Sequence, residues 1–293
     1  MSRLFLAALM AATSGFSVAN AQDGDLPSFS EVVLSEQLVY LRANTRISNP
    51  STLVYSTEEF TLVVDPGLEP TQHLLADYLG EGAVFSVTTH GHRDHAEATS
   101  ALPTPRTVIA PDFLLQGETA AAGVTHWTLG GEMRLETASG DVLMGQFPET
   151  SGHTGGDLWI WFEAENVLAA GDYFFLHGFP IIDTGWGGSV DGYFTNIEWM
   201  MGRFPADTVI VPGHGEFHPT EPRTATMAEW RAWMDDVRAS IALIQDWSSE
   251  GLSRDEIVER GLPERFAYLD ESPRIRSEER WIDFVLENAP AAD

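Results

Sequence analysis

The sequence lacks two chemically versatile side chains, cysteine and lysine. All 16 basic residues are arginine, and the cysteine count is zero. The absence of cysteine excludes disulfides, a thiolate nucleophile and cysteine metal ligands. Any bound metal must therefore be held by histidine, aspartate or glutamate. Without lysine, an anionic group on a substrate would need an arginine as its partner.

Positive charge is also scarce. Sixteen arginines face 44 acidic residues, which gives a formal net charge of −28. A surface of this charge repels phosphate backbones and anionic lipid. We therefore expect a small-molecule substrate and no nucleic-acid or membrane partner. The sequence does not predict the oligomeric state.

Long hydrophobic runs are missing, since no stretch approaches the ~20 apolar residues that span a bilayer. One shorter run, Leu4 to Ala12, follows Arg3 and precedes the small residues Ala19-Asn20-Ala21. This pattern is typical of a signal peptide, so we expect residues 1–21 to be removed and the protein to be exported, periplasmic or secreted. Residues 22–293 contain no repeat or long linker and are expected to form one domain.

Short apolar, β-branched runs separated by turns fill most of the chain and alternate with helical patterns. We expect strands at 38–41, 52–55, 60–64, 83–87, 107–110, 158–162, 167–170 and 208–211, and within 132–147. Helices are expected at 70–78, 95–101 and 112–116. The alternation predicts a layered α/β protein.

The C-terminal part has a helical pattern. Apolar residues spaced by three and four predict a helix from about 223 to 247, and a capping box at Ser253 and Glu256 predicts a second. A third is expected from 273 to 286. These helices, together about 223–288, are expected to cover the rest of the fold or to make a subunit contact.

The densest chemical signal is His90-x-His92-x-Asp94-His95, directly after the strand expected at 83–87. In extended backbone His90 and His92 project to one side, while Asp94 and His95 can turn toward a second point as the chain leaves the strand. This predicts two metal positions. Imidazole and carboxylate ligands suit zinc, and iron and manganese use the same ligand types.

The same arrangement of an expected strand, a small-residue turn and a metal-capable side chain recurs along the chain. It supplies Asp65, His153, Asp172 and His214. Alone, Asp65 is typical of an ordinary turn and His153 is weak evidence for a ligand. Because strand ends gather at one edge of a packed sheet, the recurrence predicts one shared site.

Taken in order, Asp65, His90-x-His92-x-Asp94-His95, His153, Asp172 and His214 resemble the five sequence motifs of the metallo-β-lactamase-fold hydrolases. The resemblance extends from about residue 31 to residue 218. It implies an αββα sandwich, in which two mixed β-sheets are flanked by helices, with a metal site on one edge and the C-terminal helices as an extension.

The resemblance also implies a role for each motif residue. His90, His92 and His153 would hold one zinc ion, and Asp94, His95 and His214 a second, so that the chain binds two. Asp172 would bridge the ions, Asp94 would be the catalytic residue that orients the shared hydroxide, and Asp65 would orient a metal-bound histidine.

Asp172 bears on the substrate. Typical β-lactamases of this family carry cysteine or serine at the corresponding place, whereas glyoxalase II, lactonase and phosphodiesterase relatives carry aspartate. The resemblance therefore favours the glyoxalase II and lactonase branch, and zinc-dependent hydrolysis of a lactone, ester or thioester. Two alternatives stay open: β-lactamase activity, and a mononuclear-iron oxygenase of the persulfide dioxygenase kind.

The segment 173–188 combines aromatic residues, a histidine and glycines beside the expected metal site. Such loops often line pockets. His177 and Trp186 are the candidate substrate contacts.

Overall fold

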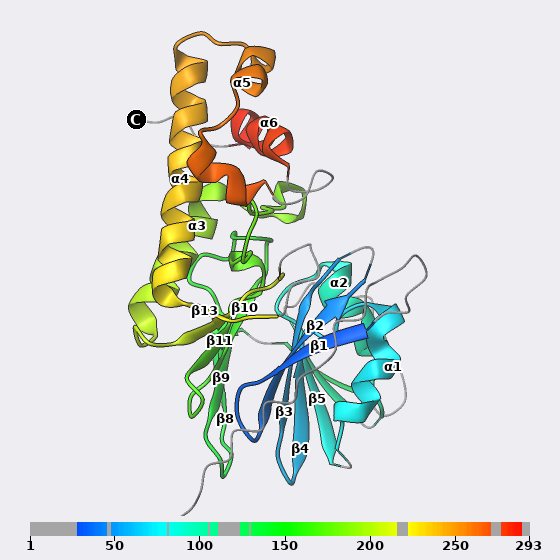
Figure 1. The fold of residues 1–293 in the computed structure, drawn as a ribbon. Helices are drawn as coiled ribbons and strands as arrows, with labels where there is room; N and C mark the ends of the chain where they lie inside the picture. The colour runs from blue at the N-terminus through cyan, green and yellow to red at the C-terminus, as the bar shows by residue number, and fades with distance from the viewer. Residues whose placement is uncertain are drawn as a thin grey trace, which may run out of the picture.

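Two β-sheets pack face to face in the computed structural model, and helices lie on their outer faces (Figure 1). The structure describes residues 28–45, 48–80, 82–104, 106–110, 124–128, 130–215, 222–270 and 277–288. The expected signal peptide and the helix expected at 112–116 lie outside these ranges. The αββα sandwich expected from the sequence is confirmed.

The first sheet has seven strands in chain order. They are β1 (Ser28–Val33), β2 (Leu38–Asn44), β3 (Ser51–Ser56), β4 (Phe60–Val64), β5 (Ala83–Val87), β6 (Arg106–Ala110) and β7 (Val124–Thr128). Strands β1 to β4 are antiparallel, and β4 to β7 are parallel. Short helical segments connect the parallel strands. Between β4 and β5 these are η1 (Glu69–Thr71), α1 (Gln72–Leu75) and η2 (Ala76–Tyr78), and between β5 and β6 they are α2 (Arg93–Ala96) and η3 (Glu97–Ala101).

The second sheet has six strands in the order β13-β12-β11-β10-β9-β8. They are β8 (Glu132–Leu135), β9 (Val142–Gln146), β10 (Leu158–Phe162), β11 (Val167–Ala169), β12 (Val209–Val211) and β13 (Ala225–Thr226). All neighbours are antiparallel except β11 and β12. This parallel pair is joined by a crossover that contains α3 (Val190–Arg203).

Strand β10 shows why the central strands are apolar throughout. Leu158, Ile160 and Phe162 face the core between the sheets, whereas Trp159 and Trp161 join the core on the outer side. Successive side chains on a strand point to opposite faces, so a strand covered on both sides needs apolar residues at every position. Because β10 is covered on both faces, a ligand can reach this part of the second sheet only at the ends of its strands.

The C-terminal region is helical, as expected. It contains α4 (Met227–Ser249), α5 (Arg254–Arg260), η7 (Glu264–Leu269) and α6 (Glu278–Asn288). Helices α3 and α4 cover the second sheet, and α4 continues past the strands to a part where α5 and α6 pack against it (Figure 1). No helix in the described ranges has the length and apolar character needed to cross a membrane.

Two helix starts differ from the expectation. Helix α4 begins at Met227 rather than near residue 223, because Thr226 pairs in β13 and forms a capping box with Glu229. Helix α6 begins at Glu278 within the described residues, and residues 271–276 lie outside them. The capping box expected at Ser253 and Glu256 is present and begins α5.

Candidate metal centre

Strands β4, β5, β9, β11 and β12 all end at one edge of the sandwich, and the loops that follow them carry the eight residues of the five sequence motifs. Seven of these residues form two groups. Within each group, the potential ligand atoms all lie within 4.8 Å of one another. The first group is His90, His92, His153 and Asp172, and the second is Asp94, His95 and His214. The eighth, Asp65, contacts His95.

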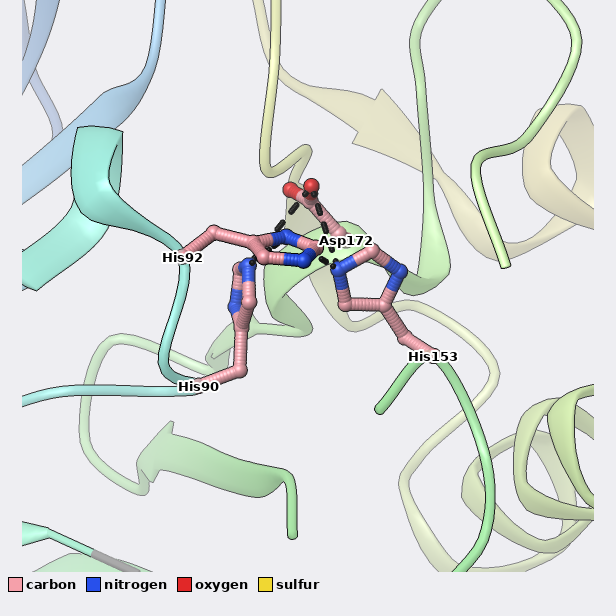
Figure 2. Close-up of side chains that lie close together, drawn as sticks. All are labelled: His90, His92, His153 and Asp172. Atoms are coloured by element: carbon pink, nitrogen blue, oxygen red, sulfur yellow. Dashed lines mark hydrogen bonds and ion pairs between the residues drawn. The ribbon is translucent and has the colours of Figure 1, made fainter. Parts of the chain in front are cut away.

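The first group is shown in Figure 2, where three imidazoles and one carboxylate point toward a common centre. His92 Nδ1 lies 3.1 Å from His90 Nε2 and 3.0 Å from His153 Nε2. Asp172 Oδ2 lies 3.7 Å from His90 Nε2 and 3.5 Å from His153 Nε2. His92 keeps 21% of its side chain exposed, whereas the other three are buried.

The second group lies against the same carboxylate. His95 Nε2 and His214 Nε2 are 3.2 Å apart, and Asp94 Oδ2 is 3.5 Å from His214 Nε2. Asp172 Oδ1 lies 3.3 Å from His95 Nε2, and Asp172 Oδ2 lies 3.3 Å from His214 Nε2. A single buried carboxylate therefore faces both groups.

Three of the imidazoles are oriented through their outer nitrogens. His95 Nδ1 donates to Asp65 Oδ2 (2.9 Å), His92 Nε2 donates to Asp183 Oδ2 (3.0 Å), and His153 Nδ1 donates to the carbonyl oxygen of Ile181 (2.7 Å). Carbonyl and carboxylate oxygens only accept hydrogen bonds, so each outer nitrogen carries a proton. When such a ring is neutral, its other nitrogen, here called the inner nitrogen because it faces the ligand atoms of the same group, carries a lone pair that can bind a metal.

Hydroxyl groups orient the other two imidazoles. The Thr89 hydroxyl donates to Asp65 Oδ2 (2.7 Å), so it accepts from His90 Nδ1 (3.0 Å). Likewise the Ser48 hydroxyl donates to Asp94 Oδ2 (2.6 Å) and accepts from His214 Nδ1 (3.3 Å). Neither Thr89 nor Ser48 stood out in the sequence, since serine and threonine are common in turns.

In the first group the inner nitrogens therefore present lone pairs to one another at 3.0 to 3.1 Å when the rings are neutral. This contact is repulsive for neutral rings and becomes favourable with a cation between them. Tetrahedral zinc with bonds of ~2.0 to 2.1 Å spaces its ligand atoms roughly 3.3 Å apart. Within the part of the chain that the structure describes, the buried Asp172 Oδ1 also receives no hydrogen bond. The residues present fit a divalent cation.

Burial and charge act differently on the two groups. Burial, aided by His95 and His153, holds the pKa of His90 well below its usual value, and burial also lowers the pKa of His153. Both rings are thus kept neutral, as metal ligation requires. Burial opposes a charge on His95, but the carboxylates of Asp172, Asp65 and Asp94 outweigh it and hold the pKa of His95 well above its usual value.

The Asp172 carboxylate at the centre is anionic. Burial alone would raise the pKa of Asp172, but His214, His95 and His90 outweigh it and hold that pKa well below its usual value. Within the described ranges, the ion pairs of Asp65, Asp94 and Asp172 are all with histidines. Asp172 is therefore a buried negative charge at the centre, which a metal cation would balance.

The backbone around Asp172 is built to hold its carboxylate in place. A Cβ atom at Gly213 would lie 2.2 Å from Asp172 Oδ1, so only glycine fits there. On the other side, the Tyr193 hydroxyl donates to the Asp172 carbonyl oxygen (2.9 Å). Tyr193 belongs to α3, so this helix helps to fix the centre.

Helix α3 was not predicted, although the sequence carries its signals. Ser189 caps its first turn by accepting from the Gly192 amide. Val190, Tyr193, Phe194 and Ile197 follow at helical spacing and are buried.

Asp183 is a further residue that sequence reasoning missed. Its Oδ2 accepts from His92 Nε2. As the N-cap of η6 (Thr184–Trp186), it also accepts through Oδ1 from the amide of Trp186 (3.0 Å). An aspartate in a glycine-containing turn is ordinary in a sequence, and 91 residues separate it from His92. Only the fold brings the two together.

The two candidate substrate contacts have different surroundings. Trp186 lies beside His92, with ring centroids 5.5 Å apart, and is 51% exposed. The ring of His177 lies 6.1 Å from that of Tyr268 in η7. Trp186 is thus at the metal centre, and His177 packs toward the C-terminal helices.

Replacing Asp183 with alanine is expected to weaken metal binding at the first group by about 10- to 100-fold, because His92 loses the acceptor that orients its ring. Asp183→Asn keeps an acceptor oxygen and should lose less. Zinc titration against a chromophoric chelator would measure both. Asp207→Ala, a control at an exposed carboxylate that accepts from Asn166, should leave affinity unchanged. Equal affinities for Asp183→Ala and the unaltered protein would contradict this role.

Comparison with known proteins agrees with the fold. A family model described as the metallo-beta-lactamase superfamily matches residues 134–214, less than a third of the chain. Among solved structures, a metallo-beta-lactamase from Pontibacter korlensis has a TM-score of 0.57 at 18% identity, with 72% of this chain and 99% of that chain covered.

Two further structures give similar values. The DIM-1 metallo-beta-lactamase has a TM-score of 0.56 at 17% identity, covering 74% of this chain and 100% of that chain. A metallo beta lactamase from Hirschia baltica has a TM-score of 0.54 at 16% identity, covering 70% and 97%. No curated protein matches this chain. At these identities the likeness establishes the metallo-β-lactamase fold.

Proposed function

We propose that this chain is a metal-dependent hydrolase of the metallo-β-lactamase superfamily, with two zinc ions at the strand-end centre. His90, His92 and His153 would hold one ion, Asp94, His95 and His214 the other, and Asp172 would lie between them. The observation that carries the proposal is the convergence of inner imidazole nitrogens at 3.0 to 3.2 Å around the buried Asp172 carboxylate.

The chemistry that zinc supplies is a water of lowered pKa and polarisation of a carbonyl group, so the chain needs no nucleophile of its own. Its residues would provide position and charge. Asp65, Thr89 and Asp183 orient imidazoles, and Ser48 holds Asp94 beside His214. Asp94 keeps 22% of its side chain exposed, which places it to orient a water and accept its proton.

We favour a lactone, ester or thioester as substrate, because an aspartate at residue 172 resembles the glyoxalase II and lactonase branch. β-Lactam hydrolysis is the second candidate, since the similar structures named above are described as metallo-β-lactamases. A mononuclear-iron oxygenase is the third, because the same ligand types also bind iron.

Metal analysis combined with a substrate panel would separate these functions. The panel comprises lactones, thioesters, aryl esters, phosphodiesters and a chromogenic cephalosporin. The proposal expects about two zinc ions per chain and turnover of a carbonyl substrate that chelation abolishes. One iron per chain would support the oxygenase, and turnover of the cephalosporin alone would support the β-lactamase. A chain that binds no metal would contradict the proposal.

We further propose that the protein acts outside the cytoplasm after removal of residues 1–21. N-terminal sequencing of native protein, recovered from the periplasm or the medium, should give Gln22 as the first residue. Native protein that retains Met1 would contradict the proposed export. The net charge of −28 supports a small-molecule substrate rather than a nucleic-acid or membrane partner.

A further inference from the structure

Trp186 is an exposed aromatic side chain next to the proposed metal centre. It is 51% exposed, and in the described part of the chain the other exposed large hydrophobic residues are Val33 and Trp127. Those two lie on strands β1 and β7 of the first sheet. Trp186 instead stands beside His92, with an interplanar angle of 45°.

The segment that carries Trp186 is fixed along the loop that carries His153. The Gly155 amide donates to the Trp186 carbonyl oxygen (2.7 Å), the Asp183 amide donates to the His153 carbonyl oxygen (2.8 Å), and the Ser189 amide donates to the Gly152 carbonyl oxygen (2.9 Å). A Cβ atom at Gly155 would lie 2.9 Å from the Trp186 carbonyl oxygen. The backbone of Trp186 is therefore held in place on the proposed metal-binding loop.

Asp183 ties this segment directly to the metal centre. One oxygen of its carboxylate accepts from the Trp186 amide and the other accepts from His92 Nε2, each at 3.0 Å. The group that orients a proposed zinc ligand thus also positions Trp186. Because half of the Trp186 ring stays exposed, burying it contributes little to the stability of the fold. The exposed part instead offers a ligand an apolar surface that is already in position.

The exposed side chains of the centre mark where a ligand can enter. His92 and Asp94 keep 21% and 22% of their side chains exposed, whereas His90, His95, His153 and Asp172 are buried. A molecule that reaches the metal past His92 meets the Trp186 ring. Asp183 lies between His92 and the Trp186 amide and keeps 31% of its side chain exposed, so its carboxylate disfavours an anionic substituent there.

We infer that Trp186 is a specificity-determining wall, and that the substrate carries an uncharged, flat apolar group next to the bond that is hydrolysed. An aryl or unsaturated acyl group has this character. The inference rests on the proposed hydrolase function and narrows its substrate class to esters, thioesters or lactones with such a substituent.

Hydroxamates provide a test that does not depend on turnover, because a hydroxamate binds zinc and its substituent reports on the neighbouring wall. Calorimetry would measure acetohydroxamate and benzohydroxamate on the zinc-loaded protein. The preference for benzohydroxamate should fall by about 10-fold in Trp186→Ala, since an aromatic contact and its buried area are lost. Trp186→Phe should keep most of it. Trp127→Ala removes another exposed tryptophan and is the control. Its preference for benzohydroxamate should equal that of the unaltered protein.

The outcomes separate the inference from the function on which it rests. An unchanged preference in Trp186→Ala would overturn the inference and leave the hydrolase proposal standing. If the zinc-treated protein binds neither hydroxamate, the metal proposal fails and the inference fails with it. Zinc content of each variant shows that its centre is intact. Trp186→Leu, which keeps an apolar side chain without a flat face, serves if the alanine variant does not fold.

Discussion

Replacing His153 with alanine is expected to abolish hydrolysis and to reduce the metal bound by the chain. His153 is fully buried, its Nδ1 is fixed by the Ile181 carbonyl oxygen, and its Nε2 lies 3.0 Å from His92 Nδ1. Its loss leaves the first group with two imidazoles. Because a metal supplies several kcal/mol of transition-state stabilisation, kcat/KM should fall by roughly three orders of magnitude.

The measurement is kcat/KM together with metal content on the same samples. His73→Ala serves as the control, because His73 is exposed on α1 and belongs to neither group. It should leave both quantities unchanged. Full activity and full metal content in His153→Ala would show that His153 is not a ligand.

Asp172→Asn is expected to keep the fold and to lose metal, because the amide is nearly isosteric with the carboxylate but removes a buried negative charge. That charge faces both groups, with oxygens 3.5 Å from His153 Nε2 in the first and 3.3 Å from His95 Nε2 in the second. Without it the second ion should be held more weakly. Activity at sub-saturating zinc should drop by about 10- to 100-fold and recover in part when zinc is added.

The control for this variant is Asp207→Asn, at an exposed aspartate before β12. It should retain metal and activity. If Asp172→Asn shows unchanged metal stoichiometry and unchanged activity in zinc-free buffer, Asp172 is not a ligand. That result would favour the mononuclear oxygenase and the β-lactamase over the proposed function.

The sequence was informative about the centre because its signals are local. Histidine and aspartate follow apolar, β-branched runs, and such runs end at a sheet edge whatever the details of packing. The strand at 83–87 and the His90 to His95 cluster are one continuous stretch, and the structure places both as expected. The same holds for Asp172 after β11 and His214 after β12.

Other features depend on contacts between distant segments and left little trace in the sequence. The Asp183 to His92 hydrogen bond requires the 181–189 segment to lie along the His153 loop, and nothing in either segment alone indicates this. Ser48 and Thr89 act through the direction of a hydroxyl proton, which depends on the acceptors around them. Helix α3 is the exception, since its cap and spacing were present in the sequence.

Anomalous diffraction from crystals of zinc-loaded protein, recorded at the zinc absorption edge, would show directly where zinc binds. We expect two peaks, one among His90, His92 and His153 and one among Asp94, His95 and His214, with the Asp172 carboxylate between them. A single peak, or zinc bound elsewhere on the chain, would contradict this expectation.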